Sequence, residues 1–315
     1  MAPKQIGNSI CEQCSQSARP DQASDVFDIK GDLVTMPQPA VLVISCDKYS
    51  DIWNPFFRLF WRRWPDCPYP VFLGTNYKSF EFDGVISIPI GEDRTWTENL
   101  SLMLDAIDSS RIIMFLEDFL MIRDVNTNLV RNMVELAEHN EVGCLRLYPH
   151  PPPTKRLKDF TGIGVIQRGD DWRVSTQTAI WDVKLLRSLA WPGLSAWEFE
   201  TICSLVSDTM PDTFWSVYEP AVKYCNGVVL GRWMPEGLDV CRRAGVEVDL
   251  CSRTAISDDE LKPRQIPRSL VELMGAILPN SMQRTIIRWL RLRRRELYLN
   301  RLLKQAGLQR PDTLK

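Results

Sequence analysis

This sequence of 315 residues lacks the signals that direct a chain into or across a membrane. No apolar stretch approaches the ~20 residues that a membrane-spanning helix needs. No basic, apolar and small-residue series of the kind found in secretory signals stands at the N-terminus. The sequence therefore predicts a protein that is neither secreted nor membrane-spanning, and we expect a cytoplasmic location.

Two nucleotide-binding signatures are also missing. The sequence contains neither G-x-x-x-x-G-K-[ST] nor G-x-G-x-x-G, so P-loop and dinucleotide-binding sites would lack their phosphate cradle. Histidine is scarce. The two histidines, His139 at a predicted helix end and His150 in a proline-rich loop, leave no histidine–carboxylate pair by local spacing. Phosphate binding and acid–base chemistry must therefore come from other residues.

The nine cysteines are scattered, and several lie in apolar runs, which is typical of a reducing compartment. Cys11 and Cys14 form one C-x-x-C pair. A structural zinc site needs four ligands, and no second pair follows at a suitable spacing, so we expect two free thiols. The surrounding residues 1–36 are polar without a sustained apolar period, which predicts a poorly ordered leader.

What the sequence has is a regular alternation of short apolar runs and segments with helical spacing. Strands are predicted over 40–44, 69–73, 85–90, 112–116 and 142–147, and helices over 52–64, 98–107 and 128–139. Such alternation predicts an α/β fold with a mostly parallel central sheet flanked by helices. We expect this domain over 37–255 and a helical extension over 256–315.

Short polar segments follow three of the predicted strands. In an open parallel sheet, ligands bind beyond the carboxyl ends of the strands, so these segments are candidate binding residues. They are Ser45-Cys46-Asp47, Gly74-Thr75-Asn76 and Glu117-Asp118. Two adjacent carboxylates after the apolar run IIMFL would repel each other unless a cation or hydroxyl donors met them. A divalent ion on a diphosphate is one such partner, and a solvated strand end or helix cap is the alternative.

Four stretches resemble bacterial glycosyltransferases of the GT-A fold, especially those of surface-polysaccharide (lipopolysaccharide or capsule) synthesis. They are VLVISCDKYSDIWNPFF, YPVFLGTN, IIMFLEDFLM, and VSTQTAIWDVKLL with the later SAWEFE, and the resemblance covers residues 40 to 250. It implies a nucleotide-sugar donor, with a UDP-sugar expected, and a saccharide acceptor, lipid-linked or on a surface glycan. It also implies that the first strand end holds base and ribose, while the acidic cluster holds ribose, metal and diphosphate.

The acidic cluster departs from the Asp-x-Asp pattern of that family. This chain has Leu116-Glu117-Asp118-Phe119, so Asp118 matches the metal-binding last Asp and the first Asp is missing. The resemblance therefore implies Mn²⁺ or Mg²⁺ at Asp118 with an incomplete set of ligands. Alternatively, basic side chains neutralise the leaving diphosphate, and Arg232 is the first candidate for this role, followed by Lys223.

Glycosyl transfer with inversion needs a carboxylate that accepts the proton of the acceptor hydroxyl. By analogy with inverting GT-A enzymes, Glu198 in the first turn of a helix predicted from Ala196 is the expected base, and Glu200 is the alternative. The segment that begins at Ser195 also fits a capping box, in which Glu198 only caps a backbone N–H.

Three further residues are candidates for contact with the substrates. Gln177 lies in Val174 to Trp181, which is predicted as a strand on the acceptor side. Trp96 and Trp197 are candidates to stack on sugar faces, although aromatic residues lie more often in a core.

The C-terminal end is strongly basic, although the formal net charge of the chain is -2. Residues 284–304 predict an amphipathic helix with many arginines and a tryptophan at its boundary. We expect this helix to bind an anionic membrane surface peripherally. The alternatives are a helix packed on the domain and, less favoured, a nucleic-acid-binding segment, for which no recognition fold is seen.

The sequence favours a glycosyltransferase over two other functions that stay open. A sugar-nucleotide nucleotidyltransferase has a similar fold but normally shows a Gly-rich loop with a basic residue, and none follows AVLVI. A non-catalytic, membrane-associated protein that binds glycan or nucleotide would be consistent with the incomplete Asp-x-Asp.

Overall fold

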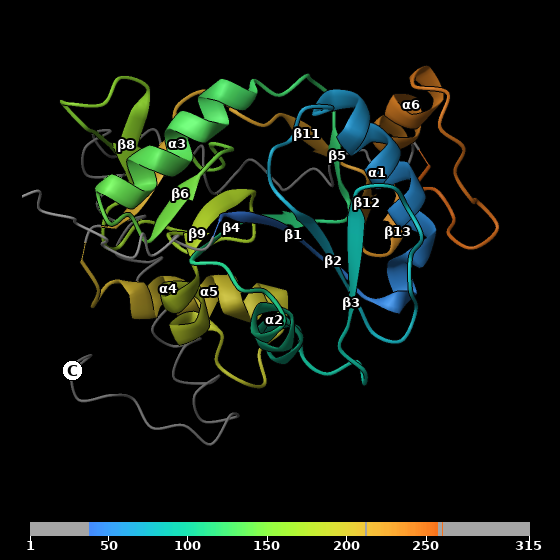
Figure 1. Ribbon diagram of the computed structural model, residues 1–315, viewed down its shortest axis with the longest axis horizontal. Coiled ribbons are helices and arrows are strands. Elements are labelled where there is room, and N and C mark those ends of the chain that lie inside the picture. Colours follow the sequence, from blue (N-terminus) through green and yellow to red (C-terminus); the bar gives the residue numbers. More distant parts are fainter. Residues whose placement is uncertain (1–37, 212, 258–259, 261–315) are drawn as a thin grey trace, which may run out of the picture. The chain divides into compact units, whose positions relative to one another are not determined.

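A computed structural model describes residues 38–211, 213–257 and 260, so the expectations for 1–36 and 284–304 lie outside the described residues. Its centre is a nine-stranded sheet with the order β3-β2-β1-β4-β9-β6-β10-β8-β7 (Figure 1). The strands are β1 (Ala40–Ile44), β2 (Val71–Thr75), β3 (Val85–Pro89), β4 (Arg111–Leu116), β6 (Cys144–Arg146), β7 (Lys155–Arg156), β8 (Ile163–Val165), β9 (Ala179–Asp182) and β10 (Phe214–Val217). Two small antiparallel sheets pair β5 (Phe119–Met121) with β11 (Tyr224–Asn226) and β12 (Val228–Val229) with β13 (Arg232–Trp233).

The central sheet is mixed but mostly parallel. β9 runs antiparallel to both β4 and β6, and β8 runs antiparallel to both β10 and β7. The other seven of the nine strands share one direction. The predicted α/β class, with a mostly parallel sheet flanked by helices, is confirmed.

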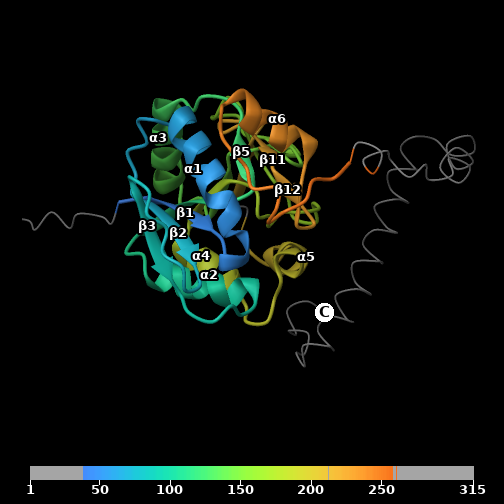
Figure 2. The same cartoon turned by 90° about the vertical axis from the view of Figure 1, so that its right-hand side faces the viewer.

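Helices cover both faces of this sheet (Figures 1 and 2). On one face lie α1 (Ser50–Arg63) and α3 (Thr127–His139), with α6 (Pro235–Arg243) beside α1. On the other face lie α2 (Trp96–Asp105), α4 (Val183–Leu189) and α5 (Ala196–Ser207). No helix in the described ranges combines the length and the apolar character needed to span a membrane.

The apolar sequence of β1 follows from its central position. All five residues of AVLVI are buried. Val41 and Val43 pack in the core under α1 and α3, whereas Leu42 and Ile44 pack in the core that includes α2, α4 and α5. Side chains alternate between the two faces of a strand, so a strand that is covered on both faces is apolar throughout.

The strand order reverses between β1 and β4. The chain leaves β1 for β2 on one side, and β4 later pairs in parallel with the other side of β1. Ile44 pairs with Leu116, so the residues that follow these two strands lie side by side. In open α/β sheets such a reversal leaves a crevice at the carboxyl ends of the strands, where ligands bind.

The segment 174–178, predicted as the first part of a strand, is irregular, and β9 begins only at Ala179. The backbone N–H of Val174 donates to the hydroxyl of Ser204, and that of Thr176 donates to the carboxylate of Glu200. Backbone groups that a strand would use for pairing are therefore bonded to side chains of α5.

Candidate functional site

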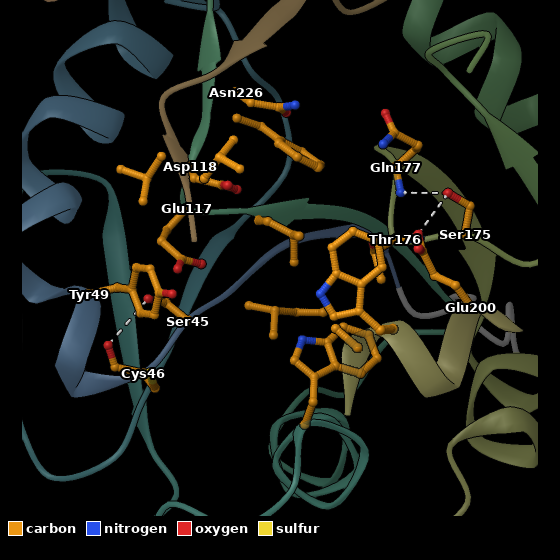
Figure 3. A pocket seen from close by; sticks show the side chains of 18 of the residues that line it. Ser45, Cys46, Tyr49, Glu117, Asp118, Ser175, Thr176, Gln177, Glu200 and Asn226 are labelled. Carbon is orange, nitrogen blue, oxygen red and sulfur yellow. Dashed lines mark hydrogen bonds between the residues drawn. The ribbon is translucent and has the colours of Figure 1, made fainter. Parts of the chain in front are cut away.

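A cavity of about 870 Å³ opens at the carboxyl ends of β1 and β4. Small-molecule sites span roughly 300–1,000 Å³, so this cavity is large enough for a substantial ligand. Figure 3 shows two groups of residues facing each other across it. We call the first group the strand edge, which comprises Ser45, Cys46, Tyr49, Glu117 and Asp118. We call the second group the helix wall, which comprises Ser175, Thr176, Gln177, Trp197 and Glu200.

The strand edge carries two adjacent carboxyl groups, on the buried Glu117 and the half-buried Asp118. Burial raises the pKa of Asp118 to about 7. Burial, and then the neighbouring charge of Asp118, raises the pKa of Glu117 well above its usual range. The guanidinium of Arg253 opposes both shifts but is outweighed. Oδ1 of Asp118 is buried without a hydrogen-bond partner among the described residues. The groups around this pair therefore do not offset the cost of burying its charged form.

The strand edge fits part of a divalent cation site. Glu117 and Asp118 both line the cavity, and Oδ1 of Asp118 is buried without a partner among the described residues. The described residues contain no group of three or more His, Cys, Asp or Glu side chains placed to hold a metal. Mg²⁺ is often held by one or two carboxylates together with substrate phosphates, so the donor set suits a cation that a diphosphate brings with it.

Gly74 and Thr75 are the last two residues of β2, and neither they nor Asp47 and Asn76 are among the residues that line the cavity. The carboxylate of Asp47 accepts hydrogen bonds from the backbone N–H groups of Asn76 (2.9 Å) and Tyr77 (3.0 Å). In return, Oδ1 of Asn76 accepts from the backbone N–H of Asp47 at 3.0 Å. Thr75 is fully buried, and a Cβ at Gly74 would overlap the side chain of Met103. These residues have structural contacts, and their predicted contact with a ligand stays untested.

Three further predicted binding residues, Ser45, Cys46 and Trp96, also line the cavity. The hydroxyl of Ser45 accepts a hydrogen bond from the indole N–H of Trp53 at 2.7 Å, which fixes its orientation. Burial raises the pKa of the Cys46 thiol, so this group stays neutral. Trp96 lines the cavity while its ring packs against that of Phe199, with 5.0 Å between the ring centroids.

The predicted basic groups lie elsewhere. The guanidinium of Arg232 forms an ion pair with Glu260 at 2.8 Å and donates to the carbonyl of Ala255. The carbonyl of Lys223 accepts from the N–H of Ile122. Neither Arg232 nor Lys223 is among the residues that line the cavity, and Arg94 is the one lysine or arginine among the described residues that do.

Glu198 and Glu200 have different roles in α5. The carboxylate of Glu198 accepts from both the backbone N–H (2.9 Å) and the hydroxyl (2.8 Å) of Ser195. With the return bond from its own N–H to the Ser195 hydroxyl, this is a complete capping box. Glu198 does not appear among the lining residues, whereas Glu200 does. The structure thus brings the alternative residue to the cavity.

Hydrogen bonds orient the carboxylate of Glu200 (Figure 3). Its Oε1 accepts from the N–H of Thr176 (2.7 Å), the hydroxyl of Thr176 (2.8 Å) and the hydroxyl of Ser175 (3.1 Å). Gln177 lies next to them, and its Oε1 accepts from the hydroxyl of Tyr224. One oxygen of Glu200 is thereby fixed, which leaves Oε2 available to a ligand.

Sequence reasoning missed several residues that shape the cavity. Arg253 comes from beyond the sheet, pairs with Asp51 at 2.8 Å and stacks over Tyr49 at 4.5 Å. Its guanidinium also donates to the carbonyl of Gly231 (2.9 Å), which lines the cavity. Trp172 and Leu230 line it as well, and both have φ near +50°. No local pattern marks these positions, because each depends on contacts between segments far apart in the sequence.

Comparisons with known proteins give weak similarity. No protein-family model matches this sequence, and no curated protein matches it. Among solved structures, S. aureus TarS 1–349 is 10% identical with a TM-score of 0.42, over 66% of this chain and 64% of that one. The same protein in complex with UDP is 10% identical with a TM-score of 0.39, over 79% of this chain and 78% of that one. A cytidylyltransferase from Leptospira borgpetersenii is 14% identical with a TM-score of 0.38, over 58% of this chain and 76% of that one.

Proposed function

We propose that this chain is a glycosyltransferase that moves a sugar from a nucleotide-sugar donor to a saccharide acceptor, with Glu200 as the base. One observation carries the proposal. A single cavity holds an acidic strand edge at the reversal of strand order and, across from it, a carboxylate oriented by hydrogen bonds. The strand edge takes the nucleotide diphosphate, and the helix wall takes the acceptor.

The transfer needs one proton to move at the helix wall. The acceptor hydroxyl oxygen attacks the anomeric carbon, and the bond from that carbon to the diphosphate oxygen breaks. Oε2 of Glu200 accepts the hydroxyl proton as the new bond forms, while three hydrogen bonds hold Oε1. Attack opposite to the leaving group inverts the configuration at the anomeric carbon. The role first assigned to Glu198 by analogy thus passes to Glu200.

The leaving diphosphate gains negative charge, which must be neutralised at the other side of the cavity. Arg94 is the candidate for this role in place of Arg232 and Lys223, because its residue lines the cavity. Glu117 and Asp118 would hold a divalent cation that arrives with the donor. Such a cation, when bound, supplies positive charge to the diphosphate oxygens.

Thermal unfolding in the presence of UDP, GDP or CMP, with and without Mn²⁺, tests the donor site. We expect UDP to raise the unfolding temperature, since a ligand at 100 times its Kd stabilises the folded state by ~2.7 kcal/mol. A panel of nucleotide sugars should then yield free nucleoside diphosphate in the presence or absence of an acceptor. No shift with any nucleotide would favour a non-catalytic glycan-binding protein, and release of pyrophosphate would identify a nucleotidyltransferase.

The proposed enzyme uses a UDP-sugar donor and a surface-glycan acceptor. It is located in the cytoplasm and binds the membrane peripherally through 284–304. Each basic side chain near an anionic surface contributes ~1 kcal/mol, so the full chain should bind vesicles with anionic lipid and dissociate as salt rises. Equal binding to neutral vesicles would contradict the electrostatic part.

A further inference from the structure

Two tryptophans at the cavity are exposed. Trp172 and Trp197 both line it, with 50% and 74% of their surface accessible. By contrast, the side chains of Trp53, Trp64, Trp181 and Trp233 are fully buried or nearly so. Exposed aromatic surface around a cavity is typical of a binding site rather than of a core.

The backbone at Trp172 is strained, and hydrogen bonds from a buried arginine hold it in place. Its φ of 51° lies in the left-handed region, which is unfavourable for a bulky residue. Arg146, fully buried, donates to the carbonyl of Trp172 and, at 3.2 Å, to the carbonyls of His150 and Pro151. Three residues that line the cavity therefore depend on one guanidinium. Strain that is fixed in this way is often part of a functional site.

Contacts along α5 place the two tryptophans on opposite sides of Glu200. The segment that follows Trp172 runs beside α5, with Val174 bonded to Ser204 and Thr176 bonded to Glu200. Trp197 lies in the preceding turn of α5, near its N-terminus. At 1.5 Å per residue, Ser204 and Trp197 are separated by about 10 Å along the helix axis. Trp172 precedes Val174 by two residues, so the two tryptophans belong to the two ends of this span, which is longer than one pyranose ring.

The surface between the two rings is polar. Ser175, Thr176, Gln177 and Glu200 line the cavity there. A sugar ring has an apolar C–H face and a rim of hydroxyl groups, so it matches aromatic surface and hydrogen-bonding groups together. A purely apolar ligand would cover Oε2 of Glu200 without giving it a hydrogen-bond partner, which is costly.

We propose that Trp172 and Trp197 stack on different rings of one oligosaccharide acceptor, on either side of the ring whose hydroxyl faces Glu200. This inference rests on the proposed function and names its substrate class, which is an oligosaccharide rather than a monosaccharide. Arg146 acts as a positioning residue for the Trp172 side.

Binding of glycan series by NMR saturation transfer tests the inference. The probes are malto-, cello-, chito- and galacto-oligosaccharides of one to five units, added to the full chain with and without UDP. In at least one series, we expect affinity to rise about tenfold or more from one to three units. Binding of none of them, or affinity independent of length, would overturn the proposal.

Variants at the two tryptophans test whether these residues cause the rise in affinity with glycan length. Trp172→Ala and Trp197→Ala should each remove most of the gain with chain length, and Trp172→Phe should restore part of it. Tyr77→Ala is the matched control, since Tyr77 is 73% exposed and not among the lining residues. Full retention of the gain in both alanine variants, checked for unchanged unfolding temperature, would also overturn the proposal.

Different results would contradict the glycosyltransferase function and the oligosaccharide acceptor. The UDP-induced rise in unfolding temperature reports the donor site and should survive in Trp172→Ala. Loss of the glycan effect with the UDP shift intact would remove only the oligosaccharide inference. Glycan binding without any nucleotide effect would instead remove the transferase and leave a glycan-binding protein.

Discussion

The carboxylates of the strand edge and of the helix wall differ in the hydrogen-bond donors around them. At the strand edge, the buried Glu117 and the half-buried Asp118 are adjacent, and Oδ1 of Asp118 has no partner among the described residues. At the helix wall, Glu200 is just as shielded by its residue exposure, 9% against 8% for Glu117, but three hydrogen bonds meet its Oε1. Glu117 and Glu200 are therefore buried to a similar extent, and they differ in the number of hydrogen-bond donors that reach the carboxylate.

This difference separates a site that needs a ligand from a site that is already organised. Desolvation disfavours the charged form of a carboxyl group, and hydrogen-bond donors restore it. The strand edge reaches its charged form most easily when a cation arrives with the diphosphate. The helix wall is oriented before any substrate binds, as a base should be. Four experiments test this comparison.

The largest effect should come from Glu200→Gln. We expect kcat to fall about 10²-fold to 10⁴-fold, because the amide does not accept the proton. The UDP-induced rise in unfolding temperature should persist. Glu198→Gln should retain activity within a small factor and lower stability by at most ~1 kcal/mol, since glutamine also completes a capping box and only the charge near the helix N-terminus is lost. The reverse pattern of activities would return the base to Glu198.

Arg94→Ala should lower the transfer rate about tenfold to hundredfold, since a hydrogen bond to a charged group contributes ~1.5–3 kcal/mol. The measurement is donor turnover at saturating acceptor. Arg58→Ala, on the exposed side of α1, is a matched control whose guanidinium bonds Asn54. Equal rates in both variants would leave the cation as the only group that neutralises the diphosphate.

Asp118→Asn should change the pH dependence of stability. Because the pKa of Asp118 is raised to about 7, the folded state binds more protons than the unfolded chain between about pH 4 and 7. The free energy of unfolding therefore falls as pH rises through this window, by at most ~1.4 kcal/mol per pH unit for this group. Denaturant unfolding from pH 5 to 8 measures it.

The asparagine variant removes this titration, so its stability relative to the parent chain should increase toward pH 8. Asn has the same shape as Asp, which keeps the packing comparable. If the difference between the two chains is constant from pH 5 to 8, the strand edge is not the strained carboxyl pair described above.

The smallest effect is expected at the tip of the β12–β13 hairpin, which lines the cavity. Leu230 is 89% exposed with φ of 50°, an unfavourable conformation for a leucine. Leu230→Asn should stabilise the fold by ~1 kcal/mol, because asparagine adopts this conformation more readily. Substrate affinity should weaken. A gain in stability with unchanged affinity would show that Leu230 does not touch a ligand.

The sequence predicted most of the central sheet and its neighbouring helices. Runs such as AVLVI and IIMFL are apolar at every position, and only a strand covered on both faces uses such a run in this way. The same logic identified the carboxyl ends of β1 and β4 as a candidate edge, and Ser45, Cys46, Glu117 and Asp118 do line the cavity. The capping box at Ser195 was also readable from four consecutive residues.

Only the tertiary structure decided which candidates meet. Glu198 and Glu200 are two residues apart, and their roles separate because helix geometry turns one toward Ser195 and the other toward Thr176. Arg94 lines the cavity, while Arg232 pairs with Glu260. A sequence determines local periodicity, because neighbours along the chain set it. It does not show the contacts of a long side chain, which depend on segments brought together only by folding.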